Sequence, residues 1–284
     1  MKVQDLTDEL LEYMPDADVD IILNAYIYSA KAHRGQSRRS GEAYISHPLE
    51  VAHNLVKLKL DPTTVAAGLL HDTIEDTLST PEEIKELFGD EIFQLVDGVT
   101  KISQIHFSSH EESQAENYRK MIFAMAHDIR VVLIKLADRA HNMQTLDSLS
   151  EERQRRIARE TLEIYAPIAN RLGIGWLKAE LESGSFRYLY PEEFRMIEEK
   201  VAKGKDNRAQ YVEKVASRLM RELKAAGIIG EVEGRPKQFF SIYKKMMDQN
   251  ISFEDVYDLI GVRVLTESLG DCYSVLGLVH SLWK

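Results

Sequence analysis

The sequence predicts a mainly α-helical domain followed by an incomplete α/β unit. Two observations lead to this fold class. From residue 18 to about residue 200, apolar residues recur with helical spacing, and strand signals are nearly absent. After residue 227, two short runs rich in branched side chains, residues 228–232 and 260–265, flank a helical pattern at residues 236–248.

Residues that start and stop helices divide the helical part. Pro62, Pro81 and Pro191 each suit the first turn of a helix, and Gly89 and Gly227 stand where helices are expected to end. A loop is expected at residues 34–46. The expected helices are 18–33, 47–59, 62–76, 81–88, 91–98, 113–126, 129–146, 151–170, 175–184, 191–200, 208–226 and, after the first strand, 236–248 and 270–283.

These patterns suggest three regions: a first domain at residues 1–150, a helical linker at 151–200, and the beginning of a second domain at 201–284. Two strands and two helices cannot close a sheet with covered faces and protected edges. We therefore expect the α/β unit to be truncated in this chain.

Composition narrows the classes of protein. The 46 Asp and Glu residues exceed the 36 Lys and Arg residues, and the net charge of −10 argues against general binding of nucleic acid or anionic membranes. Eight of the nine histidines lie in the first 150 residues, which favours metal chemistry there. Cys272 is the single cysteine, so an intrachain disulfide is excluded. No signal peptide and no apolar run of about 18 residues is found, and a soluble cytoplasmic protein is expected.

A cluster of chemistry-bearing residues ends the predicted helix 62–76. His71, Asp72, Glu75 and Asp76 are spaced so that they are neighbours at one helical end. Carboxylates crowded in this way repel one another unless a cation neutralises them. A bound divalent metal is one interpretation, and an exposed acidic helix end is the other.

Asp138 is the second candidate. It follows the largely apolar segment VVLIKLA, where a carboxylate is poorly placed for solvent, and buried carboxylates are usually paired or bound to metal. A structural ion pair with Arg139 or Arg130 is the alternative. Asn142 and Thr145 share a helix face with Asp138 and are candidates for binding a ligand.

His47 precedes Pro48 at the start of a predicted helix and, taken alone, would be interpreted as a capping residue. Together with His71, Asp72 and Asp138 it supplies two imidazoles and two carboxylates. Such a set can bind a divalent metal and leave room for water and a substrate oxygen. The two remaining carboxylates of the cluster would then support the ligands or act as a general base.

Longer segments around these residues resemble the hydrolase domain of the Rel/SpoT family of alarmone enzymes, which belongs to the HD superfamily. The segments are RRSGEAYISHPLEVA, AAGLLHDTIEDT, LVDGVTK and DIRVVLIKLADRAHNMQTL. The resemblance implies a helical HD fold that hydrolyses the 3′-diphosphate of ppGpp or pppGpp to GDP or GTP and pyrophosphate, with Mn²⁺ as cofactor.

The resemblance also implies roles for individual residues. His47, His71, Asp72 and Asp138 match the metal ligands, and Glu75 and Asp76 match the pair that positions or activates the attacking water. The positions that match nucleotide contacts are Arg38, Arg39, Ser40, Asn142 and Thr145. Lys101 and His141 are weaker candidates for the same site.

Two other functions compete with this interpretation. A non-catalytic module would bind the alarmone without cleaving it, and a general HD nucleotidase would cleave other nucleotides. Metal dependence and a substrate panel distinguish these alternatives.

The segments GRPKQFFSIYKKM, FEDVYDLIGVRV and DCYSVLGLVHSLW resemble the nucleotidyltransferase-like synthetase domain of the same family. That domain transfers pyrophosphate from ATP to the 3′ oxygen of GTP or GDP. On this resemblance Arg235, Lys237 and Lys245 would bind ATP phosphates, Asp258 would bind Mg²⁺, and Arg263 would assist.

The family's synthetase domain continues beyond the matched segments with a guanine-binding loop and a catalytic Glu. We therefore expect this chain to lack synthetase activity. Its expected partner is the guanine nucleotide alarmone, with ribosome contacts made only by C-terminal domains that this chain lacks. Neither membrane nor direct nucleic-acid binding is expected.

Overall fold

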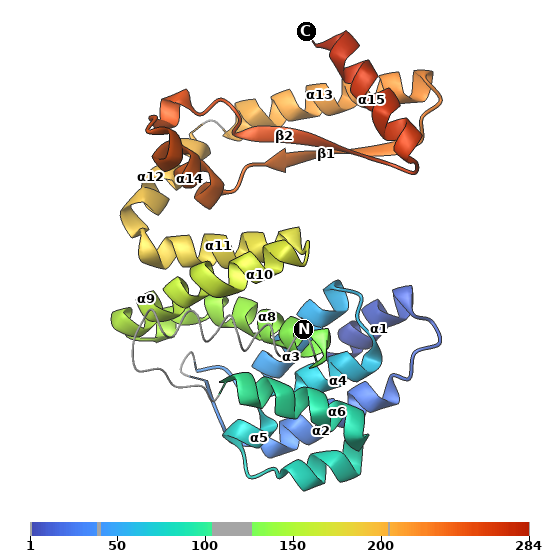
Figure 1. Ribbon diagram of the computed structural model, residues 1–284, viewed down its shortest axis with the longest axis vertical. Helices are drawn as coiled ribbons and strands as arrows, with labels where there is room; N and C mark the ends of the chain where they lie inside the picture. The colour runs from blue at the N-terminus through green and yellow to red at the C-terminus, as the bar shows by residue number, and fades with distance from the viewer. Residues whose placement is uncertain (1, 39–40, 104–126, 204, 284) are drawn as a thin grey trace. The chain divides into compact units, whose positions relative to one another are not determined.

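A computed structural model describes residues 2–38, 41–103, 127–203 and 205–283 (Figure 1). Contacts divide the chain into two compact units, Met1–Leu189 and Tyr190–Lys284. The predicted helix at 113–126 lies outside the described residues, as do Arg39 and Ser40. The predicted fold class is confirmed: the first unit is helical and the second combines helices with a small sheet.

The first unit is a succession of helices in its described part. Its α-helices are α1 (Val3–Tyr13), α2 (Asp20–Ala32), α3 (Ser46–Lys57), α4 (Pro62–Leu70), α5 (Thr73–Asp76), α6 (Pro81–Ser103), α8 (Ile129–Gln144), α9 (Glu151–Glu160), α10 (Ala166–Arg171) and α11 (Gly175–Leu189). A 3₁₀ turn, η1 (Leu146–Ser148), follows α8, and a π-helical turn, η2 (Thr161–Tyr165), joins α9 to α10.

Four predicted helices differ from the structure. The predicted helix 62–76 ends at Leu70, and the short α5 begins at Thr73 after a break. The predicted helices 81–88 and 91–98 follow one another directly in α6, with a non-helical kink at Gly89 (φ 84°, ψ 171°) that glycine adopts without a Cβ clash. The predicted helix 151–170 is interrupted by η2.

Helix α1 was not predicted. It buries Leu6 and Leu10, which are four residues apart and so lie on one face of the helix. The Lys2 backbone N–H donates to Asp5 Oδ2 at the start of the helix (2.7 Å). Leucines four residues apart among acidic residues form an amphipathic pattern, so this signal was available in the sequence.

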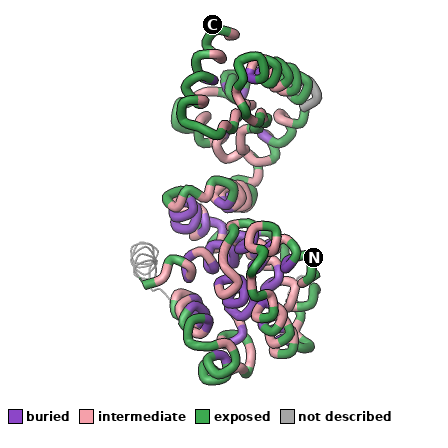
Figure 2. Tube along the Cα trace, turned by 90° about the vertical axis from the view of Figure 1, so that its right-hand side faces the viewer, coloured by how far each residue is buried: buried purple, intermediate pink, exposed green. Residues whose placement is uncertain are grey.

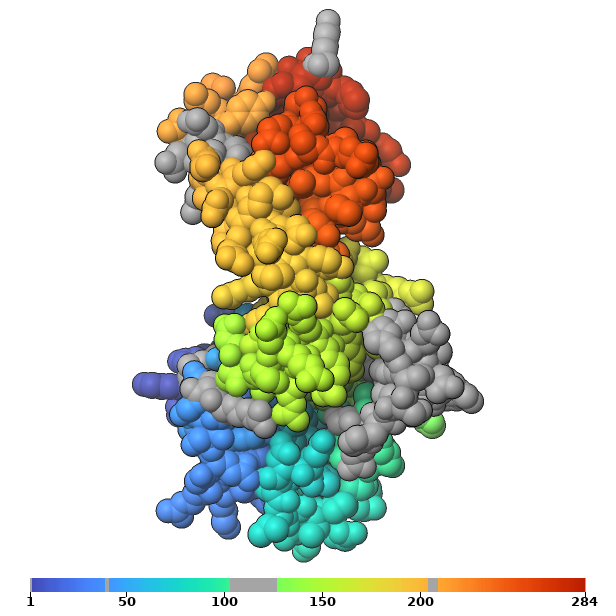
Figure 3. Space-filling model, turned by 90° about the vertical axis from the view of Figure 1, so that its left-hand side faces the viewer, coloured from blue at the N-terminus to red at the C-terminus, as the bar shows by residue number. Residues whose placement is uncertain are grey.

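The core of the first unit has two parts that meet at α8. Val131, Ile134 and Ala137 belong to a cluster with α1–α4 and α6, whereas Val132 and Leu136 belong to a cluster with α9–α11. Figure 2 shows the buried residues along these helices. Most residues of α9, in contrast, lie at the surface (yellow-green in Figure 3). Because α8 is packed on both faces, the first compact unit extends to Leu189.

The second unit contains a two-stranded antiparallel sheet, with Gly230 opposite Thr266 and Pro236 opposite Ile260. Its strands are β1 (Gly230–Pro236) and β2 (Ile260–Thr266), and its helices are α12 (Pro191–Ala202), α13 (Lys205–Ala225), α14 (Phe239–Gln249) and α15 (Leu269–Leu282), with a 3₁₀ turn, η3 (Phe253–Asp255). Gly227, with φ 70°, follows the end of α13 as the sequence predicts.

The two compact units do not share the boundaries that the sequence suggests. The predicted division into residues 1–150, 151–200 and 201–284 concerns functional domains and stays a prediction. Among the described residues, none of the helices is both long enough and apolar enough to span a bilayer.

Candidate metal centre

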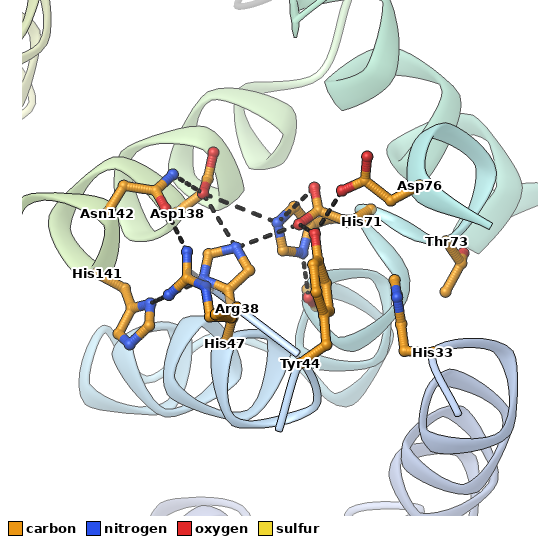
Figure 4. A network of polar contacts seen from close by, with 12 residues as sticks. His33, Arg38, Tyr44, His47, His71, Thr73, Asp76, Asp138, His141 and Asn142 are labelled. Carbon is orange, nitrogen blue, oxygen red and sulfur yellow. Dashed lines mark hydrogen bonds and ion pairs between the residues drawn. The ribbon is translucent and has the colours of Figure 1, made fainter. Parts of the chain in front are cut away.

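The four predicted metal ligands come together in the first unit, and Figure 4 labels three of them, His47, His71 and Asp138. His47 Nε2 lies 3.2 Å from Asp72 Oδ2 and 3.3 Å from Asp138 Oδ1. His71 Nε2 lies 3.0 Å from Asp72 Oδ1 and 3.9 Å from Asp138 Oδ1. One ligating atom each of His47, His71 and Asp138 lies within 4.8 Å of the others, and Asp72 lies beside both histidines through its two carboxylate oxygens.

Helix packing explains why these side chains meet. His47 lies in the first turn of α3, Asp138 lies in α8, and α3 packs against both α4 and α8. His71 caps the buried α4, and Asp72 lies in the break before α5. His47, His71 and Asp138 are only 2%, 0% and 3% exposed. Such burial of polar groups is stable only with partners or a bound ion.

The orientation of His71 fits metal binding. Its Nδ1 lies 2.8 Å from the carbonyl oxygen of Gly68, which accepts a hydrogen bond from it. In the neutral ring this bond leaves the lone pair on Nε2, which faces the carboxylates. His71 Nε2 is buried, and its nearest charged neighbours are Asp72 Oδ1 at 3.0 Å and Asp138 Oδ1 at 3.9 Å. A buried imidazole nitrogen facing two carboxylates suits a metal ligand.

Charges around the cluster keep its carboxylates ionised. Burial alone would raise the pKa of Asp138, but Lys135 and then His47 outweigh it and hold the pKa well below its usual range. Burial would likewise raise the pKa of Asp72, but His71 and His47 lower it well below its usual value. Burial lowers the pKa of His71, and the Asp72 carboxylate more than compensates, raising it to about 9.

Two donors hold Asp138 in place. Lys135 Nζ donates to Asp138 Oδ2 (2.6 Å), and Asn142 Nδ2 donates to Asp138 Oδ1 (2.5 Å). The alternative pairs suggested by the sequence are not formed. Arg130 pairs with Asp128 and Glu91, and Arg139 Nη2 lies 3.2 Å from Glu160 Oε1.

Three of the predicted nucleotide contacts lie beside the metal ligands. Arg38 Nη2 donates to Asn142 Oδ1 (2.9 Å), and Arg38 Nη1 donates to Thr145 Oγ1 (3.4 Å). The loop that carries Arg38 is closed by a bridge between Ser37 and Ala43. The other two predicted contacts, Arg39 and Ser40, lie outside the described residues.

A cavity of about 420 Å³ adjoins this group, a size typical of small-molecule sites. Basic, acidic and amide groups meet apolar side chains in its wall. Its lining residues are Ser37, Arg38, Tyr44, Lys135, Asp138, Arg139, Asn142, Thr145, Leu146, Ser148, Leu149 and Ile157. The cavity therefore combines a ligand of the candidate metal with the predicted nucleotide contacts.

The predicted catalytic pair, Glu75 and Asp76, follows the candidate ligand Asp72. The Tyr44 hydroxyl donates to Asp72 Oδ2 (3.1 Å) and also contacts Asp76 Oδ2, so it bridges the two carboxylates. The side chain of Glu75 is exposed at this helix end. Partial desolvation raises the pKa of the Glu75 carboxyl; Lys135 opposes this rise and Asp72 adds to it.

Sequence reasoning missed two residues of this site, Tyr44 and Lys135, and gave low weight to a third, His141. Lys135 interrupts an apolar segment three residues before Asp138, and this signal was available in the sequence. His141 is buried, with its Nδ1 2.7 Å from His47 Nδ1. Burial, and then the charges of His47 and Arg38, lower the pKa of His141 to about 3. The other weak candidate, Lys101, is an exposed partner of Asp97.

In the second unit, three of the predicted synthetase residues form one cluster. Lys237 Nζ donates to Asp258 Oδ2 (2.5 Å), and Lys245 Nζ donates to Asp258 Oδ1 (2.7 Å). These two hydrogen bonds lower the pKa of Asp258 to about 2. Arg235 on β1 and Arg263 on β2 are exposed, opposite Gly261 and Glu233 in the sheet register.

Comparison with known families agrees with this geometry. Residues 25–175, which carry all four candidate ligands, match the family described as HD domain. The chain belongs to the HD domain family. Residues 234–284 match the region found in RelA and SpoT proteins. The presence of both regions confirms the predicted relationship to the Rel/SpoT family.

Curated relatives extend along nearly the whole chain. A GTP pyrophosphokinase of Myxococcus xanthus is 56% identical over 276 residues, which cover 96% of this chain and 36% of the relative. The bifunctional (p)ppGpp synthase/hydrolase SpoT of Escherichia coli K12 is 47% identical over 281 residues, covering 99% of this chain and 40% of the relative. A guanosine-3′,5′-bis(diphosphate) 3′-pyrophosphohydrolase of Aquifex aeolicus is 45% identical, with 98% and 39% covered. This chain thus spans less than half the length of these relatives.

Proposed function

We propose that the first unit is a metal-dependent hydrolase that removes the 3′-diphosphate of ppGpp or pppGpp, yielding GDP or GTP and pyrophosphate. The observation that carries the proposal is the convergence of His47, His71 and Asp138, with Asp72 beside both histidines, next to the cavity that Arg38 lines. The names of the SpoT and pyrophosphohydrolase relatives support this substrate class.

His47, His71, Asp72 and Asp138 would hold one divalent cation. Two imidazole nitrogens and carboxylate oxygens suit several first-row metals, and Mn²⁺ is proposed on the family resemblance. When bound, such an ion lowers the pKa of a water molecule and neutralises charge on a phosphate oxygen. Lys135 and Asn142 keep Asp138 ionised and fixed toward the ion.

Glu75 and Asp76 would move the proton of the attacking water. Water attacks the phosphorus that is bonded to the ribose 3′ oxygen, the bond between them breaks, and the 3′ oxygen takes up a proton as pyrophosphate leaves. The Tyr44 hydroxyl orients Asp76 toward Asp72, and partial desolvation raises the pKa of the Glu75 carboxyl, which makes Glu75 a stronger base. Comparing Glu75→Gln with Asp76→Asn identifies which carboxylate acts as the base.

Arg38, Asn142 and Thr145 would contact the nucleoside. A planar guanidinium such as that of Arg38 stacks well on a guanine ring, and the amide and hydroxyl of the other two suit the ribose and base edges. Arg39 and Ser40 complete this group on the family resemblance. In the free chain Arg38 is held by Asn142 and Thr145, so it is already aligned along the cavity wall.

For the second unit we propose a role in phosphate binding within the synthetase reaction of a whole Rel/SpoT protein, from ATP to GTP or GDP. Lys237 and Lys245 would exchange their hydrogen bonds with Asp258 for contacts to ATP phosphates, and Asp258 would then bind Mg²⁺. The exposed Arg235 and Arg263 would add positive charge.

A cytoplasmic location is proposed for the protein.

The hydrolase is tested by measuring pyrophosphate release from ppGpp with Mn²⁺ and with EDTA. We expect release that requires the metal, has GDP as co-product and is lost in Asp72→Ala. Asp90→Ala is a matched control, since Asp90 is an exposed partner of Lys85 on α6, a helix that carries none of the four candidate ligands. Thermal melting of each variant verifies the fold.

Other outcomes favour other functions. Binding of ppGpp without cleavage under Mn²⁺, Zn²⁺ or Fe²⁺ contradicts the hydrolase and favours a non-catalytic alarmone-binding module. Equal cleavage of ppGpp, GTP and dGTP favours a general HD nucleotidase.

A further inference from the structure

His141 lies between a candidate metal ligand and the nucleotide loop. Its Nδ1 is 2.7 Å from His47 Nδ1 and 3.0 Å from Arg38 Nη1. The side chain is buried in the last turn of α8. Figure 4 shows His141 and Asn142 pointing toward Arg38 from that turn. One ring nitrogen thus has two partners, and both are close enough for hydrogen bonds.

The positions of the protons follow from the chemistry of these groups. A guanidinium only donates hydrogen bonds, so His141 Nδ1 must be the acceptor of the bond from Arg38. An unprotonated His141 Nδ1 cannot donate to His47, so His47 Nδ1 must carry the proton between the two rings. In the neutral His47 ring the lone pair then lies on Nε2, which is the nitrogen that faces Asp72 and Asp138.

Asn142, which follows His141 in the chain, provides a second connection between Arg38 and the candidate metal centre. Arg38 Nη2 donates to Asn142 Oδ1, and Asn142 Nδ2 donates to Asp138 Oδ1. The amide orientation is dictated by its partners, because a guanidinium donates and a carboxylate accepts. Arg38 is therefore connected to His47 by way of His141, and it is connected to Asp138 by way of Asn142.

We propose that His141 is a positioning residue that selects the tautomer of His47 with a free Nε2 and links Arg38 to the metal centre. This inference rests on the metal centre of the proposed function. His141 is not itself a ligand: the described donor atoms that converge belong to His47, His71 and Asp138, while His141 Nδ1 faces the far side of the His47 ring. Hydrogen bonds of this kind to metal-binding histidines fix the ring orientation and raise ligand basicity.

The first test needs no substitution. Side-chain ¹⁵N spectra of the chain saturated with the diamagnetic ion Zn²⁺ are recorded at a pH at which the imidazoles are neutral, since without a cation the Asp72 and Asp138 carboxylates favour a proton on His47 Nε2. We expect His47 to carry its proton on Nδ1 and His141 to carry its proton on Nε2. A His47 ring protonated on Nε2, or a His141 ring protonated on Nδ1, would overturn the proposal.

The second test compares two variants by titration of the full chain with Mn²⁺. His141→Ala removes the acceptor, and we expect Mn²⁺ affinity to fall about 10–100-fold. His141→Asn places an amide oxygen near the position of Nδ1, and we expect it to recover most of the affinity. His53→Ala is the matched control, because His53 pairs with Glu9 and Glu50 and touches none of the ligands.

The outcomes separate a positioning role from a structural one. If His141→Asn binds Mn²⁺ as weakly as His141→Ala while both melt like the parent chain, the acceptor is not what matters and the proposal fails. It fails equally if His141→Ala binds Mn²⁺ as tightly as the parent. The parent chain could also show the expected tautomers and Mn²⁺ affinities without cleaving ppGpp. That result would contradict the proposed function and leave the positioning role of His141 intact.

Discussion

At the scale of single residues, proton positions decide what the cluster can bind. His71 Nδ1 donates to a backbone carbonyl, so its Nε2 is the atom available to a metal. In the absence of metal, the Asp72 carboxylate raises the pKa of His71 to about 9 against the opposing effect of burial. The ring therefore carries a second proton at neutral pH, on the nitrogen that a metal requires.

Metal binding should consequently release this proton. At pH values below about 9, each decrease of one pH unit is expected to weaken Mn²⁺ affinity by about tenfold, because His71 must lose this proton before it can bind the metal. Isothermal titration at pH 7 in two buffers with different ionisation enthalpies measures the release directly. We expect about one proton per Mn²⁺, and the same binding heat in both buffers would contradict the assigned role of His71.

Lys135 supplies another prediction at this scale. It is the buried cation beside Asp138, and removing one member of a buried ion pair typically costs about 3–5 kcal/mol. We expect Lys135→Met to lower the free energy of unfolding by an amount of this order. A bound divalent cation would replace part of the lost charge, so Mn²⁺ should raise the melting temperature more in this variant than in the parent.

The control is Lys85→Met, which removes the exposed partner of Asp90 and should change stability by no more than about 1 kcal/mol. Equal Mn²⁺ stabilisation of the parent and Lys135→Met would indicate that Lys135 does not share the charge of Asp138 with the metal.

At the scale of elements, breaks in the helices matter as much as the helices. The chain leaves α4 at Leu70 and re-enters a helix at Thr73, and this break carries both His71 and Asp72. A single helix through residue 76 would separate these adjacent residues by roughly 100°.

The π turn η2 ends at Tyr165, whose ring lies 4.2 Å from the guanidinium of Arg139. Arg139 in turn lines the cavity.

The small sheet offers a matched pair of glycine substitutions. A Cβ at Gly230 would lie 2.6 Å from the backbone oxygen of Leu265, whereas the nearest heavy atom to a Cβ at Gly261 is 3.8 Å away. We expect Gly230→Ala to destabilise the second unit by about 1–3 kcal/mol, because a backbone atom of β2 cannot move without breaking the strand pairing. Gly261→Ala should be neutral or slightly stabilising.

Urea unfolding followed by the fluorescence of Trp283 in a Trp176→Phe background measures this difference. These are the two tryptophans of the chain, one in each unit. Equal midpoints for the two alanine variants would mean that β1 and β2 are not paired in the observed register.

At the scale of the whole molecule, the two units carry different chemistry. All four candidate ligands belong to the first unit, and the Lys237, Lys245 and Asp258 cluster belongs to the second. The first unit stays compact through residue 189 because α8 contributes to two hydrophobic clusters. The segment between residues 151 and 189 is therefore part of the body that holds the candidate metal centre.

Chelation should affect the two units differently. A ligand that binds only the folded state stabilises it by about 2.7 kcal/mol at a free concentration 100 times Kd. We expect EDTA to lower the melting temperature followed by Trp176 and to leave the transition followed by Trp283 unchanged. Single-tryptophan variants, Trp176→Phe and Trp283→Phe, assign the signals. A shift of the Trp283 transition alone would place the metal outside the first unit.

The sequence by itself determined the helical class, the change to an α/β pattern after residue 227, and the set of candidate ligands. These features depend on local spacing: His71 and Asp72 are adjacent, Asp138 interrupts an apolar helix, and His47 begins one. Side chains placed by local helix geometry can be predicted before the fold is known. The helix at 113–126 and the roles of Arg39 and Ser40 stay predictions.

Only the tertiary structure decided which side chains support the ligands. Arg38 and His141 are 103 residues apart, and His47 and His141 are 94 residues apart, yet both pairs are within hydrogen-bond distance. Tyr44 joins Asp72 and Asp76 in the same way. The local sequence around His141 and Tyr44 carries no trace of these partners, because hydrogen-bond distances between remote segments are determined by how α3, α4 and α8 pack.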